Sequence, residues 1–113
     1  MQISILKSKI HLATITGTHL DYEGSIAIDA KLMEACGLFP GEKVAVLNHN
    51  NGNRFETYTI LGEPGQIELR GPAARLGKKG EKVIILSYAL VTPEETKTFK
   101  PNIVRVDDNN KIK

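Results

Sequence analysis

The sequence contains a single cysteine, Cys36, so no disulfide can form within the chain. It also lacks a long apolar run, since the longest, residues 83–86, is far shorter than the roughly 20 residues that span a bilayer. No positively charged segment followed by an apolar one opens the chain, so we expect no secretory signal. Together these absences predict a cytoplasmic protein that does not associate with membranes.

Neither sign of charge dominates, because 15 lysines and arginines stand against 13 acidic residues, for a formal net charge of +2. A nucleic-acid-binding domain usually carries a strong basic excess, so we expect no nucleic-acid partner. Neither of the two common glycine-rich phosphate-binding motifs is present. The histidines at positions 11, 19 and 49 have no cysteine or acidic partner at ligand spacing, so we expect no metal site.

The composition that remains is that of a small globular domain. The chain has 113 residues, of which 41% are hydrophobic and 25% are charged. Domains typically hold about 100–150 residues, and a chain of this length can bury a core without disulfides or metals. We therefore predict that residues 1–113 form one domain.

Short segments rich in β-branched and aromatic residues alternate with turn signals along most of the chain. Asn51-Gly52 is a strong hairpin signal, and Pro64-Gly65 marks a further turn. Residues 17–24 are expected to form a loop, and residues 107–113 a frayed polar tail. We predict strands over residues 3–7, 10–16, 25–28, 43–47, 54–61, 66–69, 82–90 and 103–106, with 82–90 in the core.

Only one segment favours an α-helix, residues 30–35, with Asp29 as its N-cap and Gly37 at its C-terminal end. Residues 71–74 are expected to form a tight turn or a single helical turn, and residues 92–95 a capped helical turn. Seven or eight short strands and one short helix predict an all-β fold, either a closed β-barrel or a sandwich.

Arg54 and Tyr58 are four positions apart on a predicted strand, so their side chains share a face, whereas Thr57 points to the opposite face. A guanidinium can bind a carboxylate through two hydrogen bonds, and a phenol can deliver a proton nearby. A surface arginine and a half-buried tyrosine would produce the same pattern. Lys9 and His11 also share a face, as residues on any solvated strand face would.

Gly24-Ser25 stands where a predicted loop enters a predicted strand. A glycine–serine pair is common in turns. At this place, however, a serine hydroxyl can reach the preceding carbonyl if the backbone is strained, and glycine accepts unusual dihedral angles. Cys36 has no basic neighbour in the local sequence, so it is expected to be a small buried hydrophobe rather than a nucleophile.

Three segments follow one another in a distinctive order and spacing: residues 9–11 (Lys-Ile-His), residues 21–29 around Tyr22-Glu23-Gly24-Ser25, and residues 51–58, which end in Arg-Phe-Glu-Thr-Tyr. With residues 71–74 and 100–102, this pattern resembles the bacterial L-aspartate α-decarboxylases over essentially the whole chain. Either the Tyr-x-Gly-Ser or the Arg-Phe-x-Thr-Tyr segment alone would be a weak signal, but the pair at this separation is specific.

The resemblance implies a double-psi β-barrel that assembles as a homotetramer with active sites between subunits. It also implies an inactive precursor, or zymogen, that cleaves itself between Gly24 and Ser25 into chains of residues 1–24 and 25–113. The Ser25 hydroxyl would attack the Gly24 carbonyl, and later steps would leave a pyruvoyl group at residue 25. Thr57 would steady the carbonyl oxygen of Gly24 as charge develops.

The resemblance further implies that L-aspartate forms a Schiff base with the pyruvoyl group and loses CO₂ to give β-alanine, a precursor of pantothenate and coenzyme A. Arg54, with Lys9, would bind substrate carboxylate, and Tyr58 would donate a proton to the carbanion-like carbon. The implied substrate-binding residues are Lys9, Arg54, Thr57, Gly71, Pro72 and Ala73.

The chain departs from the family at one segment, where the usual Asn-Gly-Ala-Ala-Ala reads Arg70-Gly71-Pro72-Ala73-Ala74. Arg70 replaces an amide side chain near the cleavage loop, and Pro72 removes a backbone N–H. Gly71 and Ala73 remain suitable as backbone donors. Two other classes stay open at this point: a barrel that serves as a non-catalytic binding module, and an unprocessed relative that never matures.

Overall fold

A computed structural model describes residues 1–113 and is built mainly from β-strands. The single α-helix and two 3-10 helices are short. The elements are β1 (Ile3–Thr14), β2 (Gly17–His19), β3 (Ser25–Asp29), α1 (Ala30–Cys36), β4 (Lys43–Asn48), β5 (Arg54–Gly62), β6 (Ile67–Arg70), η1 (Gly71–Arg75), β7 (Lys82–Val91), η2 (Glu95–Lys97) and β8 (Asn102–Arg105). The predicted all-β fold with one short helix is confirmed.

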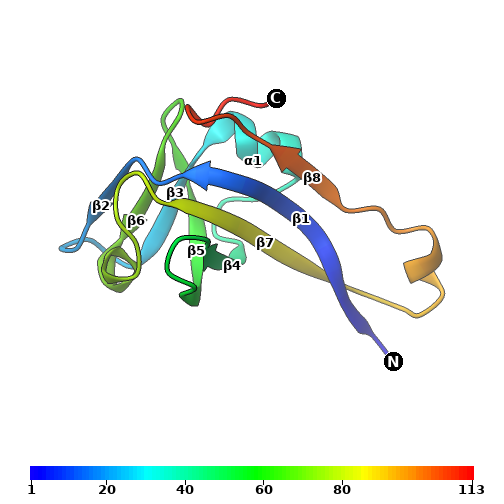
Figure 1. Cartoon of the computed structure of the whole chain (residues 1–113). Helices are drawn as coiled ribbons and strands as arrows, with labels where there is room; N and C mark the ends of the chain where they lie inside the picture. The colour runs from blue at the N-terminus through cyan, green and yellow to red at the C-terminus, as the bar shows by residue number, and fades with distance from the viewer.

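The eight strands form one sheet in the order β2-β6-β3-β5-β4-β7-β1-β8. Strands β1 and β7 are long antiparallel neighbours that extend away from the rest of the molecule toward the N-terminus (Figure 1). The link between β1 and β2 joins distant parts of this order, because Ile15 N–H donates to the carbonyl of Glu81 and Thr16 N–H to that of Ile67. The sheet therefore curls around its apolar face.

The core lies inside this curled sheet and is closed by α1, whose buried residues are Leu32, Met33 and Cys36. The predicted core strand, β7, alternates between buried and more exposed residues, and its two most exposed residues lie near its end. Val83 and Ile85 are fully enclosed, whereas Tyr88 and Leu90 are 50% and 66% exposed. The largest fully buried side chains are Ile10, Ile15, Ile26, Ile28, Leu32, Met33, Ile67, Leu69, Ile85, Val44, Val46 and Val83.

Two predictions for residues 3–24 are wrong. The two strands predicted at residues 3–7 and 10–16 are one strand, β1, whose register against β7 shifts between Leu6 and Ser8 and again between Ile10 and Ala13. Leu12 has a φ of 58° at the second shift, so an irregularity bends the strand without ending it. The predicted loop contains β2, because Gly17–His19 pairs in parallel with β6.

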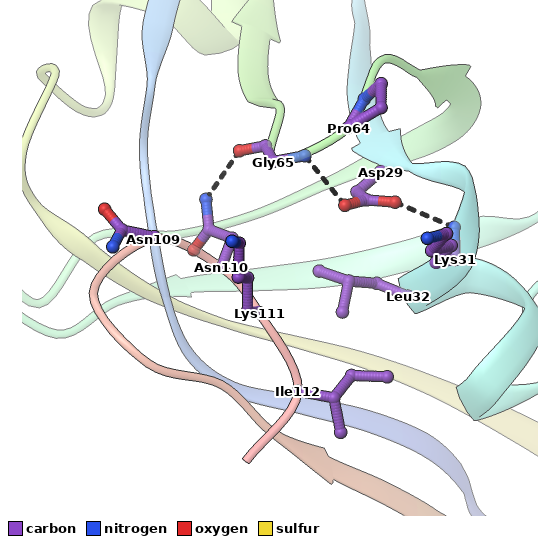
Figure 2. A pocket seen from close by; sticks show the side chains of 9 residues that line it. All are labelled: Asp29, Lys31, Leu32, Pro64, Gly65, Asn109, Asn110, Lys111 and Ile112. Carbon is purple, nitrogen blue, oxygen red and sulfur yellow. Dashed lines mark hydrogen bonds between the residues drawn. The ribbon is translucent and has the colours of Figure 1, made fainter.

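The helix and the main hairpin form where the sequence predicts them. The Asp29 carboxylate accepts the N–H of Lys31 at 2.8 Å and that of Gly65 at 2.7 Å, so it caps α1 and ties it to the β5–β6 turn (Figure 2). Gly37 ends the helix with a φ of 72°. Strands β4 and β5 pair on either side of the turn that contains Gly52. The structure has no helix with the length and apolar character needed to cross a membrane.

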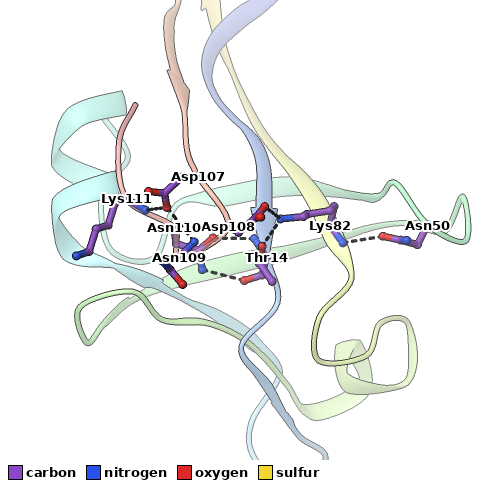
Figure 3. Close-up of polar contacts among 8 residues, drawn as sticks. All are labelled: Thr14, Asn50, Lys82, Asp107, Asp108, Asn109, Asn110 and Lys111. Atoms are coloured by element: carbon purple, nitrogen blue, oxygen red, sulfur yellow. Dashed lines mark hydrogen bonds and ion pairs between the residues drawn. The ribbon is translucent and has the colours of Figure 1, made fainter.

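The C-terminal segment is ordered, so the predicted frayed tail is wrong. Asn110 is 1% exposed, and its amide accepts Thr14 N–H at 2.7 Å and donates to Thr14 O at 2.8 Å and Gly65 O at 2.9 Å. Lys82 Nζ lies 2.8 Å from the carboxylate of Asp108 and 2.6 Å from Thr14 Oγ1 (Figure 3). We call residues 107–113 the C-terminal clamp, since they join β1, β7 and the β5–β6 turn.

Candidate active site

Ser25 is the first residue of β3, a strand paired on one side with β5 and on the other with β6. The serine is 3% exposed, and its hydroxyl lies 3.5 Å from the carbonyl oxygen of Glu23. Every residue of β3 is buried, whereas residues 21–23 before it are exposed. The Gly24–Ser25 bond is therefore located where an exposed turn enters the buried sheet.

Two cavities lie on either side of this bond. The larger, of about 420 Å³, is lined by Asp21, Tyr22, Glu23, Ser25, Tyr58, Ile60 and Arg70. The smaller, of about 190 Å³, is lined by Gly24, Phe55, Glu56, Thr57, Pro72, Ala73 and Leu76. The two residues joined by this bond thus line different cavities, Ser25 the larger one and Gly24 the smaller one. We call these the Ser25 cavity and the Gly24 cavity.

Strand β5 supplies one predicted residue to each cavity. Its register against β4 runs without a break from Lys43 opposite Tyr58 to Leu47 opposite Arg54, so neighbouring side chains alternate faces. Thr57 lines the Gly24 cavity together with its neighbours Phe55 and Glu56, and Tyr58, 39% exposed, lines the Ser25 cavity. The strand has no bulge between Arg54 and Tyr58, and still one of the two residues lines a cavity with Gly24 and the other a cavity with Ser25.

The 3-10 helix η1 packs directly against this bond through Gly71. Gly71 has a φ of +68°, and a Cβ on it would lie 2.7 Å from both Cα and N of Gly24. Only glycine fits such an approach without displacing the backbone. The ring carbon Cδ of Pro72 is 3.5 Å from the position that a Cβ on Gly24 would take. The helical turn predicted at residues 71–74 is confirmed as a 3-10 helix that closes one side of the site.

Lys9 and Arg54, the two cations predicted to bind carboxylate, lie outside both cavities. Lys9 is on β1, between Leu86 of β7 and Ile103 of β8. Arg54 is exposed at the start of β5, and neither cation forms a salt bridge within the chain. The single chain thus brings Ser25, Thr57, Tyr58 and η1 together but leaves these two cations apart, and their roles stay predictions.

Sequence reasoning did not assign Arg70 to the site, although it noted Arg70 as a departure from the family. In the structure Arg70 is directly opposite Ser25 in the β3–β6 pair and lines the same cavity. Its Nε donates to Glu68 at 2.7 Å, and its guanidinium carbon lies 4.8 Å from the centroid of the Tyr22 ring. The only signal in the sequence was the unusual residue itself, because nothing local indicates that β3 and β6 pair.

The largest cavity, of about 560 Å³, is remote from the Gly24–Ser25 bond and shares no lining residue with either cavity there. It lies between the start of α1 and the C-terminal clamp (Figure 2), and is lined by Asp29, Lys31, Leu32, Pro64, Gly65, Asn109, Asn110, Lys111 and Ile112. Its two buried polar residues, Asp29 and Asn110, already have hydrogen-bond partners in the chain. Size alone therefore does not mark it as the reactive site.

Cys36 and His11 have shifted pKa values, and both are residue types that can act in catalysis. Burial raises the pKa of the Cys36 thiol to about 11, so the thiolate is scarce at neutral pH. Cys36 is fully buried, which confirms its predicted role as a small core residue. The pKa of His11 is lowered, first by burial and then by nearby positive charges that include Lys9 and Arg105. Its Nδ1 is enclosed and has no hydrogen-bond partner.

Comparison with known proteins yields one family over the whole chain. A family model described as aspartate decarboxylase matches residues 1–113. A protein of Caldicellulosiruptor saccharolyticus named aspartate 1-decarboxylase is 60% identical over 114 aligned positions, covering 99% of this chain and 89% of the relative. Proteins of the same name from Campylobacter jejuni and Dehalococcoides mccartyi are each 59% identical, covering 97% and 96% of this chain and 88% and 89% of the relatives.

Proposed function

This chain belongs to the aspartate decarboxylase family, and from that premise we propose that it converts L-aspartate to β-alanine and CO₂. β-Alanine would then serve the synthesis of pantothenate and coenzyme A. The observation that carries the proposal is the position of the Gly24–Ser25 bond, with Thr57 in the cavity on one side and Tyr58 in the cavity on the other.

The chain first acts on itself. The Ser25 hydroxyl attacks the Gly24 carbonyl carbon, the C–N bond breaks, and an ester replaces the peptide bond. Elimination frees the Gly24 carboxylate and leaves a dehydroalanine, which takes up one water and releases ammonia to give a pyruvoyl group. The products are residues 1–24 and 25–113, the latter beginning with the pyruvoyl group. Thr57 lines the Gly24 cavity, which supports our assignment of this residue to stabilise negative charge on the Gly24 carbonyl oxygen.

The surroundings of residue 25 fit a pyruvoyl group, because Ser25 opens into a cavity of about 420 Å³ while its backbone is held between two strands. When formed, the group supplies a ketone that condenses with the substrate amine and accepts the electron pair released with CO₂. Tyr58 lines the same cavity, which supports our assignment of its phenol as the proton donor to the substrate carbon. Gly71, Pro72 and Ala73 form the wall on the Gly24 side.

We propose that the active enzyme is a cytoplasmic homotetramer of double-psi β-barrels with its active sites between subunits. The positions of Lys9 and Arg54 support this, since both lie outside the cavities of their own chain and would need a neighbouring subunit to approach a substrate. Large apolar side chains that a monomer would leave in water also support it. On the extended β1–β7–β8 ribbon these are Ile3, Tyr88, Leu90 and Ile103, which are 38–66% exposed.

One experiment tests both reactions. The wild-type chain is expected to separate into two fragments, with the larger one lighter than an unmodified 25–113 chain by the mass of one ammonia. Ser25→Ala is expected to fold but stay whole and inactive. Tyr58→Phe is expected to be cleaved yet turn over aspartate roughly 100-fold more slowly. Intact mass, circular dichroism and β-alanine release by the same samples give all the readouts.

The same data decide between the proposed enzyme and the other classes. A wild-type chain that stays whole and releases no β-alanine would favour a binding module or an unprocessed relative. An active Ser25→Ala variant would contradict the self-cleavage mechanism. Full turnover by Tyr58→Phe would assign Tyr58 to packing and leave the proton donor elsewhere.

A further inference from the structure

We propose that Arg70 binds a carboxylate of the substrate beside residue 25 and so takes part in selecting an acidic amino acid. This inference rests on the proposed function and adds a binding residue to it. Arg70 is the only cation among the residues that line the Ser25 cavity. Lys9 and Arg54 do not reach that cavity within the chain, so Arg70 is the positive charge that one subunit supplies to its own reactive residue.

Arg70 and Ser25 are directly opposite each other in the antiparallel β3–β6 pair. Side chains at such positions project from the same face, with Cβ atoms about 4.5–5.5 Å apart. An aspartate joined through its amine to residue 25 carries both carboxylates within a few bonds of that attachment point. The guanidinium of Arg70 is therefore within reach of a substrate held at residue 25.

The guanidinium is held in place but is not saturated. Its Nε donates to Glu68 Oε1 at 2.7 Å, and its guanidinium carbon lies 4.8 Å from the centroid of the Tyr22 ring. An arginine has five N–H donors, and the four on the terminal nitrogens make no hydrogen bond within this chain. The Arg70 side chain is 22% exposed. Two fixed contacts and free donors are what a preorganised carboxylate site requires.

The acidic residues around the cavity do not cancel this cation. Asp21 and Glu23 line the cavity but are exposed, so water and salt screen their repulsion of the two substrate carboxylates. Glu68 offsets part of the Arg70 charge by binding its Nε. Because Nε is occupied, a substrate carboxylate would bind the terminal nitrogens. A guanidinium–carboxylate pair with two parallel hydrogen bonds acts at short range and therefore prevails over screened charges at the rim.

The test compares Arg70→Asn, Arg70→Lys and the control Arg75→Asn, which removes an exposed arginine of η1 that lines neither cavity. Rates are expressed per mole of cleaved chain, so a change in self-cleavage does not affect them. For Arg70→Asn we expect the KM for aspartate to rise roughly 10–100-fold with kcat changed little, the loss of a charge-assisted hydrogen bond. The KM of Arg70→Lys is expected to lie between those of Arg70→Asn and the wild type. The KM of Arg75→Asn is expected to equal that of the wild type.

Competitive inhibition by succinate, a dicarboxylate without an amine, reports binding apart from chemistry. Its inhibition constant is expected to rise with the KM in Arg70→Asn. An unchanged KM and inhibition constant in an active Arg70→Asn enzyme would overturn the inference and leave the proposed function standing. Wild-type protein that releases no β-alanine would instead remove the proposed function itself.

If Arg70→Asn is not cleaved, succinate binding is measured on uncleaved Ser25→Ala, with and without Arg70→Asn, by NMR titration. The cavity exists in the uncleaved chain, in which residues 24 and 25 are still joined. Binding to Ser25→Ala that is lost on adding Arg70→Asn would support the inference. Equal binding by the two chains, or no binding to Ser25→Ala, would overturn it.

Discussion

At the scale of single residues, protonation of the His11 imidazole is expected to lower the stability of the fold. Its Nδ1 is enclosed without a partner, and its pKa is below the ordinary value of 6.5, first because burial disfavours the charged ring. The positive charges of Lys9, Arg105, His49 and Lys113 lower it further. The unfolded chain therefore binds a proton at a higher pH than the folded chain does, and acidification favours unfolding.

We expect the free energy of unfolding to be highest above pH 6.5 and to fall as the pH drops toward the lowered pKa of His11. The carboxylates of Asp107 and Asp108 also have lowered pKa values, but they act below their ordinary value of 3.8, outside this window. In His11→Gln the curve between pH 7.5 and 5 is expected to be flatter. Urea unfolding at several pH values measures it.

His19→Gln is the matched control, because His19 is an exposed histidine. Its stability is expected to follow the wild type through the same pH range. Parallel curves for His11→Gln and the wild type would show that the His11 imidazole does not account for the acid sensitivity.

Residue-level predictions succeeded where the strand period alone decides. Thr57 and Tyr58 were expected on opposite faces of one strand, and the unbroken β4–β5 register places them there. The alternation of side chains along the strand could not show that Thr57 would line a cavity with Gly24 and Tyr58 a cavity with Ser25. That depends on β3 pairing with both β5 and β6, and the same pairing puts Arg70 opposite Ser25. Pairing between distant segments leaves no local pattern in the sequence.

At the scale of elements, η1 packs tightly against the cleavage site through Gly71. A Cβ on Gly71 would lie 2.7 Å from Gly24 Cα and 2.8 Å from Tyr22 O, so Gly71→Ala must displace one of the two segments. We expect this variant to be cleaved at least about 10-fold more slowly, since a displacement of about 1 Å commonly costs that much in a positioned reaction. The fraction of cut chain is followed by intact mass over time.

Gly80→Ala is the control that separates the effect of backbone strain from the effect of the clash between a Cβ at residue 71 and Gly24. Gly80 has a φ of +93°, also a conformation that glycine favours, but a Cβ there would have no neighbour within 4 Å. This variant is expected to lose roughly 1 kcal/mol of stability and to cleave at the wild-type rate. Equal cleavage rates for Gly71→Ala and the wild type would mean that η1 does not hold the Gly24 backbone.

The elements predicted well are those with local signals. Asp29 and Gly37 delimit α1 as expected, and Asn51-Gly52 marks the β4–β5 turn. The helical turn predicted at residues 92–95 is displaced, since η2 covers Glu95–Lys97, but Thr92 N–H donates to the Glu95 carboxylate and Glu95 N–H to the Thr92 hydroxyl just before it. Strand β2 was missed because it is short and exists only through its hydrogen bonds to β6, far along the chain.

At the scale of the whole molecule, the C-terminal clamp closes the fold between its two ends. Asn110 and Thr14 are 96 positions apart, yet they exchange two hydrogen bonds, and the same amide also donates to Gly65. The sequence of the clamp is polar and reads as a frayed end. Its order depends on the match between one buried amide and three backbone groups of two remote segments, and composition does not encode that match.

Replacing Asn110 tests whether this closure stabilises the fold. Asn110→Ala leaves the N–H and carbonyl of Thr14 and the carbonyl of Gly65 without partners in a site that is 1% exposed. At about 1 kcal/mol for each hydrogen bond, the free energy of unfolding is expected to fall by roughly 2–4 kcal/mol. Asn110 also has a φ of 61°, which alanine tolerates less well. Urea unfolding at a fixed subunit concentration measures the loss.

Asn109→Ala is the matched control, because the Asn109 side chain is exposed and only its backbone N–H is bonded, to Asp107. It is expected to change the free energy of unfolding by less than about 0.5 kcal/mol. Below its unfolding transition, Asn110→Ala should still cleave itself, because the clamp lines neither cavity at the Gly24–Ser25 bond. If the two variants were equally stable, the three hydrogen bonds of Asn110 would contribute nothing net, and the closure would depend on the strands alone.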